Sequence, residues 1–462
     1  MSTEHSLAPG GDVTRQGSVE RHRSISTEDL SSRSWLRPAP YDASAASLAE
    51  HVHAITQVMG GQGRLWLGPF DPPPQVPAAA RETALVVPTS GSTGQAKAVA
   101  QTRRALIASH DATAALFAAD GTAAETAGHG FWLPLLPPTH IAGIQVIARA
   151  CRTAQVLGLR APALPDPLPD LRRHFDADAF ADVAEPALAQ AEAAGLPAFT
   201  SLVPTQLARI ITGTSGADAR ARGLLRHFAA VLVGGAAIAP DVLARARGAR
   251  IAVRTTYGSS ETAGGCVYDR RPLDGVRLRI EDPDEEGAGR LLISSPTLAL
   301  GYLTADGELL AAGTTHEGAP WLRTSDLARL ENDLLTVIGR ADDVIITGGR
   351  KVLPQDVERA IDRSLMLRDI VTDAVVVGVP DSEWGERIEA LVVLSQLVEP
   401  TEATALVHSA LRTSEVPGWM IPKRVHAVSE LPLLGIGKID RSAAQALAQA
   451  RGARDGTGPG MV

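Results

Sequence analysis

A short segment rich in glycine and hydroxyl side chains carries the clearest chemical signal in the sequence. It reads Thr89-Ser90-Gly91-Ser92-Thr93-Gly94-Gln95-Ala96-Lys97. Glycine lets a backbone approach a ligand closely, and successive backbone N–H groups in such a loop form a concave site for anions. The segment follows an apolar run that predicts a strand and precedes helical spacing over residues 99–116, as phosphate loops do. We expect it to hold a polyphosphate, with Lys97 supplying positive charge; the alternative is a flexible linker.

Residues in other segments have chemistry that suits a bound nucleotide. Tyr257 ends a predicted strand, where its ring could lie on adenine, and Glu261 follows in a glycine-flanked loop that suits Mg²⁺ beside phosphates. Asp326 could accept hydrogen bonds from ribose hydroxyls, with Arg340 nearby, and Lys438 lies in a glycine-rich stretch. Each residue also has a plainer interpretation: a core tyrosine, a solvated acid, a helix N-cap and a solvated surface lysine.

These segments together resemble the adenylate-forming superfamily, which contains acyl-CoA synthetases, adenylation domains and luciferases. The motifs of that superfamily occur in its order at residues 89–97, 257–262, 324–326, 339–343 and 437–441. The chain departs from it at Ala96 and Ala98, where Pro and Gly are usual, and at Ser325, where Gly is usual. The resemblance implies an enzyme that activates a carboxylic acid with ATP as an acyl-adenylate and then passes the acyl group to a thiol, that of coenzyme A.

The resemblance also implies roles for individual residues. Lys438 would reach the reacting carboxylate and the α-phosphate, with His140, Glu261 and Lys97 as the other catalytic groups. Asp342 would be the hinge between two domain orientations, and Mg²⁺ would be held by Glu261 and Thr93. The ATP-binding positions would be Thr89, Ser90, Gly91, Ser92, Thr93, Gly94, Lys97, Gly235, Ala236, Tyr257, Gly258, Asp326 and Arg340. The acyl pocket would be formed by His140, Ser201, Thr205, Gly234, Ser260, Thr262, Gly264 and Gly265.

Two segments narrow the choice of acid. Residues 260–269, which continue into Pro272-Leu273-Asp274-Gly275, and residues 346–352 resemble the o-succinylbenzoate–CoA ligases of menaquinone biosynthesis. The small residues at 263–265 would leave room for an aromatic keto acid, and Arg270 could meet its second carboxylate. Alternatives are a ligase for another aryl or medium-chain acid, an enzyme that loads a carrier protein, and an inactive adenylate-binding scaffold. The Gly-x-x-x-x-Gly-Lys-[Ser/Thr] spacing of P-loop kinases is absent, which counts against that class.

The elements that must position these residues predict an α/β fold. Apolar runs at residues 84–87, 198–203, 229–233 and 251–255 alternate with helical patterns, which favours parallel strand pairs. Residues 289–340 predict the short strands and turns of a small β-subdomain, and a compact α+β unit follows. We expect a disordered extension at 1–34, a large AMP-binding domain of mixed and parallel sheets with helices at 35–339, a mobile C-terminal domain at 340–450 and a tail at 451–462.

Composition sets limits on compartment and partners. The net charge of -8 and pI of about 5.9 argue against a general nucleic-acid or membrane-surface protein, since binding to phosphates needs a basic face. Cys151 and Cys266 form no CxxC pair, so we expect two reduced thiols rather than a disulfide or zinc site. No signal peptide or membrane span is evident, which makes the cytoplasm the default. The oligomeric state stays open, a homodimer included.

Overall fold

The structure is a computed structural model that describes residues 34–89, 96–316, 318–364, 366–367, 370–395, 398–399, 402–414, 416–433 and 439–455. The predicted site residues Ser90, Gly91, Ser92, Thr93, Gly94 and Lys438 lie outside these ranges. So do residues 1–33 of the predicted extension and residues 456–462 of the predicted tail. In the part that is described, no helix is both long enough and apolar enough to span a bilayer.

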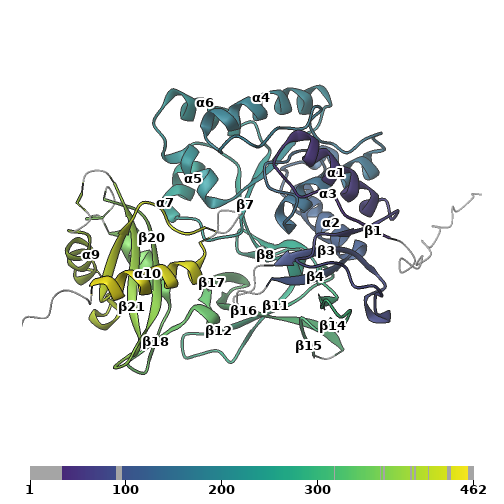
Figure 1. The fold of residues 1–462 in the computed structure, drawn as a ribbon. Coiled ribbons are helices and arrows are strands. Elements are labelled where there is room, and N and C mark those ends of the chain that lie inside the picture. The colour runs from purple at the N-terminus through teal and green to yellow at the C-terminus, as the bar shows by residue number, and fades with distance from the viewer. Residues whose placement is uncertain are drawn as a thin grey trace, which may run out of the picture.

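Two six-stranded sheets form the N-terminal part of the molecule (Figure 1). The first has the order β1-β2-β3-β4-β13-β14, with strands Trp35–Leu36, Arg64–Trp66, Thr83–Thr89, Lys97–Thr102, Gly301–Leu303 and Leu309–Leu310. The second has the order β10-β9-β8-β7-β6-β5, with strands Arg271–Pro272, Gly264–Tyr268, Val253–Ser259, Ala230–Gly234, Ala198–Leu202 and Phe131–Leu133. Strands β5 to β8 run parallel, which confirms the predicted parallel pairs.

The prediction of a helix directly after the glycine-rich segment is wrong. Residues 97–102 form strand β4, which pairs antiparallel with β3, so that Lys97 lies opposite Thr89. Helix α2 begins only at Arg103, where the Thr102 side chain accepts a hydrogen bond from the backbone N–H of Ala105. The predicted helix over 99–116 is therefore wrong only at residues 99–102, while residues 103–116 are helical. Alternation and helical spacing are hard to separate in a short alanine-rich run.

Helices cover both faces of the second sheet. Helices α4 to α7 pack on one face around Phe180, Leu207 and Val242, and α2 and α3 pack on the other around Phe117 and Val146. The helices of this part are α1 (Ala45–Met59), α2 (Arg103–Ala119), α3 (Ile141–Leu157), α4 (Ala177–Ala193), α5 (Pro204–Thr212), α6 (Gly216–Leu225) and α7 (Pro240–Gly248). This layering explains why β6 is buried at every position and why β7 is a continuous apolar run rather than an alternating one.

A third sheet forms the predicted small β-subdomain. Its strands are β11 (Arg277–Glu281), β12 (Ala288–Ser294), β15 (Gly313–His316), β16 (Ala319–Glu331) and β17 (Leu334–Arg340). Leu291, Ile293 and Leu335 pack into the same apolar cluster as α2, so this sheet is anchored to the N-terminal part. The predicted boundary near residue 340 falls at the end of β17.

The C-terminal part is a separate α+β unit, drawn in green to yellow in Figure 1. Its strands are β18 (Ile345–Thr347), β19 (Arg350–Val352), β20 (Val371–Asp381), β21 (Gly385–Leu394) and β22 (Arg424–Val428). Its helices are α8 (Pro354–Arg363), α9 (Ala403–Arg412) and α10 (Arg441–Asp455). Apolar residues of α8 and α9 cover one face of its sheet, while α10 covers the other. Next to the N-terminal part, burial raises the pKa of Asp373, and the nearby charge of Arg209 in α5 offsets part of this rise.

Both cysteines are buried and free, in agreement with the expectation of reduced thiols. Cys151 lies in α3 and Cys266 in β9, in different apolar clusters. Burial raises the pKa of Cys151 to about 11 and that of Cys266 to about 12. Both groups are therefore neutral thiols near pH 7.

A buried acidic residue is fixed in the C-terminal sheet. Glu389 is fully buried; its Oε1 lies 2.6 Å from Arg387 Nε and its Oε2 lies 2.7 Å from His426 Nε2. Burial alone would raise the pKa of Glu389, but the hydrogen bonds from His426 and Arg387 outweigh it and hold that pKa below its ordinary value. The ionised carboxylate is thus part of what stabilises this unit.

We expect Glu389→Gln to lower the free energy of unfolding at pH 7 by about 2–3 kcal/mol, since it removes one charge of a buried pair. A carboxyl with a lowered folded-state pKa stabilises the fold above its unfolded-state pKa, and this contribution is lost as the pH falls through the folded-state value. The difference between wild type and variant should therefore shrink below about pH 4.5. Urea unfolding followed by circular dichroism at pH 7 and pH 4 measures it. Glu383→Gln, at an exposed position, is the control.

Candidate active site

An aromatic and acidic pair joins the second and third sheets. Tyr257 of β8 donates a hydrogen bond from its hydroxyl to Asp326 Oδ2 of β16 at 2.5 Å, and Arg340 Nη1 lies 3.6 Å from Asp326 Oδ1. Asp326 and Arg340 face each other across strands β16 and β17. Burial, together with the Asp326 charge, raises the pKa of Tyr257 well above its ordinary value, so the phenol remains a donor. The alternative that Asp326 caps a helix is wrong, because it lies inside a strand.

A second cluster joins the first sheet to the turn after β8. Tyr302 of β13 donates a hydrogen bond to Glu261 Oε1 at 2.9 Å. Lys97 Nζ lies 4.9 Å from the centre of the Tyr302 ring, within cation–π range. Burial and the Glu261 carboxylate raise the pKa of Tyr302, so its hydroxyl remains protonated. Lys97, at the end of the glycine-rich segment, and Glu261 are thereby brought to one tyrosine.

The turn that carries Glu261 is rigid and tightly packed. It consists of the single 3₁₀ turn η4 (Ser260–Thr262), whose N-cap Ser259 accepts a hydrogen bond from the Glu261 backbone N–H. The Thr262 hydroxyl bonds within the turn, to the backbone of Ser259 and Gly264. A Cβ at Gly258 would lie 2.0 Å from the Gly264 carbonyl oxygen, so only glycine fits there. Thr262, predicted in the acyl pocket, is buried in this turn as a structural group.

The other predicted acyl-pocket residues gather where parallel strands end. Ser201 lies near the carboxyl end of β6, Gly234 ends the neighbouring strand β7, and His140 follows β5 as the N-cap of α3. In open α/β sheets, ligands bind outside the carboxyl ends of such strands. His140 is partly buried, and its Nδ1 lies 3.0 Å from the Thr139 hydroxyl. Thr205, in the first turn of α5, is exposed at the same edge.

The remaining predicted positions lie around this edge. Gly235 has a positive φ of 88° and, like Ala236, is exposed in the loop after β7. The carbonyl of Ser260 accepts a hydrogen bond from the Gln101 amide at 2.7 Å. Gly264 has a φ of 94°, and Gly265 lies beside it in β9. The Gln145 side chain of α3 donates a hydrogen bond to the carbonyl of Ala263, directly before them. The turn is therefore braced by polar side chains from β4 and α3.

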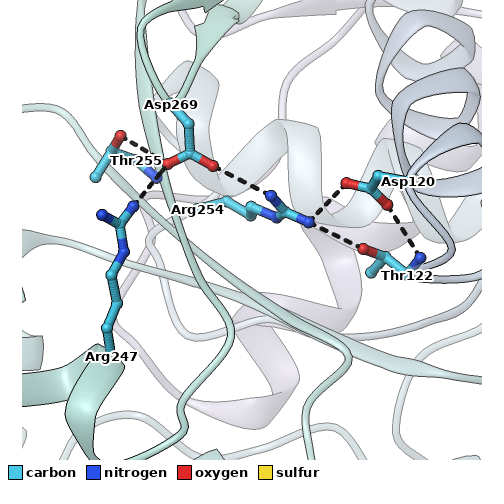
Figure 2. Close-up of polar contacts among 6 residues, drawn as sticks. All are labelled: Asp120, Thr122, Arg247, Arg254, Thr255 and Asp269. Atoms are coloured by element: carbon cyan, nitrogen blue, oxygen red, sulfur yellow. Dashed lines mark hydrogen bonds and ion pairs between the residues drawn. The ribbon is translucent and has the colours of Figure 1, made fainter.

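A charged network fixes the opposite end of β8, as Figure 2 shows. Asp269 accepts hydrogen bonds from the Thr255 backbone N–H at 3.0 Å and from Arg247 at 3.1 Å. Arg254 lies between Asp269 and Asp120, at 3.3 Å and 2.6 Å. Asp269 sits with positive φ in the tight turn between β9 and β10. The network therefore sets the register of β8 and β9, and with it the positions of Tyr257 and the Glu261 turn.

The residues present fit a magnesium ion held mainly by substrate. In the part of the chain that is described, no cluster of three or more acidic, histidine or cysteine side chains could hold a metal alone. Glu261 supplies a single carboxylate whose Oε1 is fixed by Tyr302. Mg²⁺ is commonly bound by one or two carboxylates plus phosphate oxygens, and this donor set matches that arrangement.

The predicted hinge lies between the two parts of the molecule. Asp342 belongs to the short turn η5 (Ala341–Asp343) that separates β17 from β18, and its carboxylate lies 3.4 Å from Arg340 Nη2. The neighbouring Asp343 pairs at 3.2 Å with Arg441, which also binds Glu358 at 2.9 Å. Arg441, at the start of α10, is thus held by ion pairs next to the predicted hinge.

Sequence reasoning missed some polar residues of the site. Tyr302 and Gln101 were not singled out, because they come from strands remote in sequence from Glu261 and carry no motif spacing of their own. The glycine directly before Tyr302 is the sequence signal that could have drawn attention to this tyrosine. In the structure Gly301 has a positive φ. Arg270, expected near a second substrate carboxylate, donates instead to the Leu335 carbonyl and the Thr336 hydroxyl of β17.

Comparisons with known proteins find relatives for both parts of the chain. The family model of the AMP-binding enzymes matches residues 14–303, and that of the AMP-binding enzyme C-terminal domain matches residues 360–438. A probable 2-succinylbenzoate–CoA ligase of Mycobacterium tuberculosis is 37% identical over 365 residues, which span 78% of this chain and 84% of that protein.

Solved structures share the fold. The o-succinylbenzoate CoA synthetase of Bacillus subtilis, in complex with its acyl-adenylate intermediate, is 24% identical with a TM-score of 0.58, over 79% of this chain and 69% of that chain. ATP-bound MatB from Rhodopseudomonas palustris is 22% identical with a TM-score of 0.62, over 81% and 69% of the respective chains. At these identities the likeness establishes the two-part α/β architecture.

We expect Tyr302→Phe to weaken binding of Mg-ATP about tenfold, because Glu261 loses the hydrogen bond that fixes its carboxylate, which is worth about 1.5 kcal/mol. Isothermal titration calorimetry measures the dissociation constant. Tyr41→Phe is the matched control, since the Tyr41 hydroxyl is buried without a hydrogen-bond partner among the described residues. Equal affinities in the two variants would contradict a role for Tyr302 in the site.

Proposed function

We propose that this chain, which belongs to the family of AMP-binding enzymes, is an ATP-dependent ligase that joins a carboxylic acid to coenzyme A through an acyl-adenylate. The proposal rests on the two side-chain clusters that lie at the two ends of the segment 257–261. Tyr257 with Asp326 and Arg340 suits adenine and ribose, while Glu261 with Tyr302 and Lys97 suits phosphates.

The acid that we propose is o-succinylbenzoate, which would place the reaction in menaquinone biosynthesis. The 37% identity with a probable 2-succinylbenzoate–CoA ligase extends over most of both chains, which supports this choice over an unrelated acid. The small residues Ala263, Gly264 and Gly265 line the turn at the sheet edge where His140 and Ser201 also lie. The aromatic acid would occupy that edge, with His140 beside it.

Adenylation requires two anions to approach each other. The acid carboxylate must attack the α-phosphate, so negative charge has to be neutralised there. We assign Lys97 and the glycine-rich segment to the polyphosphate, and Lys438 to the carboxylate and α-phosphate. Mg²⁺, held by Glu261 and by Thr93 of that segment, would neutralise further phosphate charge. Positioning supplies much of the remaining rate, because little proton transfer is needed.

Thioester formation follows on the same adenylate. AMP is a good leaving group, so the thiolate of coenzyme A can displace it from the acyl carbonyl. We assign the change between the two half-reactions to rotation of the domain 340–450 on the domain 35–339, with backbone rotation at Asp342. The two buried thiols, Cys151 and Cys266, are compatible with a cytoplasmic setting.

The test is pyrophosphate release from Mg-ATP with a panel of acids that includes o-succinylbenzoate, with and without coenzyme A. We expect release with o-succinylbenzoate and a coenzyme A adduct by mass spectrometry. Release with another acid would retain the reaction and reject the menaquinone assignment. Transfer to a carrier protein in place of coenzyme A would favour a loading enzyme. No release with any acid would favour the inactive scaffold.

We expect Lys438→Ala to reduce acyl-adenylate formation by at least about a hundredfold, in the range found when an electrostatic group at a reacting centre is removed. Thioester formation from a supplied acyl-adenylate should be much less affected. Rapid-quench measurement of each half-reaction checks this, and equal losses in both would contradict the assigned role.

We expect Asp342→Pro to slow overall turnover while acyl-adenylate accumulates, because proline fixes the φ angle that the hinge must change. Asp342→Ala removes the carboxylate and leaves the backbone free, so it should retain most of the turnover. Quantifying enzyme-bound acyl-adenylate by mass spectrometry distinguishes the variants. Normal turnover in Asp342→Pro would place the hinge elsewhere.

A further inference from the structure

A small cavity with basic walls lies between helices α2 and α3, away from the sheet edge that carries the proposed chemistry. His110 and Thr113 of α2 and Arg149, Arg152 and Thr153 of α3 line it, together with His129. Its volume of about 10 Å³ is room for about one small atom or ion. An occupant that fits within it is therefore a single small ion or a water molecule.

Two side chains at the cavity have polar atoms that are buried without a partner. Neither ring nitrogen of His110 has a hydrogen bond to any residue that the structure describes. The same is true of the Nε of Arg149. His110 is 2% exposed and Arg149 is 6% exposed. Leaving one such group unsatisfied costs about 1–3 kcal/mol, so the presence of Arg149 Nε and of the His110 N–H in the wall of one cavity indicates an occupant that accepts hydrogen bonds from both.

The hydroxyl groups of the wall are already committed elsewhere. Thr113 donates to the Ser109 carbonyl, and Thr153 donates to the Gly130 carbonyl. The Arg149 Nη2 donates to the Tyr268 hydroxyl at 3.0 Å, and its guanidinium lies over the Trp132 ring. Arg149 Nε and the protonated nitrogen of the His110 ring are thus buried donors in this wall that have no partner among the described residues.

The charge balance of the cavity is positive. Arg152 is neutralised by Asp111 through two hydrogen bonds of 2.8 Å and 2.9 Å. Within the described ranges, no acidic side chain is paired with Arg149, which is nevertheless buried. Burial and the neighbouring Arg149, Arg152 and His129 lower the pKa of His110 well below its ordinary value, so His110 is neutral near pH 7. One net positive charge remains, and a buried guanidinium without a counter-charge costs several kcal/mol.

We propose that this cavity is a binding site for one small monovalent anion of the halide class, held by Arg149 Nε and the ring N–H of His110. A bound water could satisfy the same hydrogen bonds, but it would leave the Arg149 charge uncompensated. An anion satisfies both requirements at once. The anion would also stabilise β9. Tyr268 belongs to that strand, and its hydroxyl accepts a hydrogen bond from Arg149 and lies within hydrogen-bond distance of Thr113.

Bromide provides a direct test, because its anomalous scattering separates it from water. We expect crystals of the full chain grown in sodium bromide to give an anomalous peak between His110 and Arg149 Nε. In solution, the unfolding temperature in sodium chloride should exceed that in sodium gluconate of equal ionic strength by about 1–2 °C, once chloride is about fivefold above its dissociation constant. A cavity that holds only water in bromide crystals, with equal unfolding temperatures in the two salts, would overturn the proposal.

A pair of variants assigns the effect to this cavity. Arg149→Met keeps an apolar stem of similar length and removes the charge, so it should abolish both the anomalous peak and the chloride dependence of unfolding. Arg160→Met makes the same change at an exposed position and should retain both. A chloride effect that survives in a folded Arg149→Met would place the anion elsewhere and refute the site. The wild-type measurements decide the question even if Arg149→Met does not fold.

Discussion

The close approach of two backbone segments at Gly258 and Gly264 is the constraint on which the site depends. Because no side chain fits between them, β8 must turn sharply into η4, and a seven-residue strand can present Tyr257 on one side and Glu261 just beyond its end. The same sharp turn lets Tyr257 reach the third sheet while Glu261 reaches the first. A single segment thereby connects all three sheets.

The rest of the N-terminal part holds that segment in register. The ion pairs around Asp269 fix its start, and polar side chains from β4 and α3 contact its end. Parallel strands β5 to β7 supply a common edge beside it, where His140, Ser201 and Gly234 lie. A small change in the turn after β8 would therefore alter both clusters, because Tyr257 and Glu261 lie on the same short segment.

Much of this arrangement could be predicted from the sequence. Strands β6 and β7 and the centre of β20 were recognisable because runs that are buried on both faces are rich in apolar residues. The order of the motifs placed Arg340 near Asp326. The strand at 97–102 was not predictable from spacing, since alanine suits either state and only pairing with β3 decides the outcome. Tyr302 could not be placed either, because its contact with Glu261 depends on how the first sheet folds against the second. The roles of Thr93 and Lys438 remain predictions.

The burial of both cysteines has a consequence for an enzyme whose acceptor is a thiol. An acyl-adenylate is an electrophile that reacts with any accessible thiolate, and disulfides exchange with thiolates in the same way. Cys151 and Cys266 are enclosed in apolar clusters and are neutral near pH 7. The protein therefore offers its intermediate no internal competitor. It also gives an oxidised acceptor no partner for a mixed disulfide, so the protein itself should regain full activity once the acceptor is reduced again.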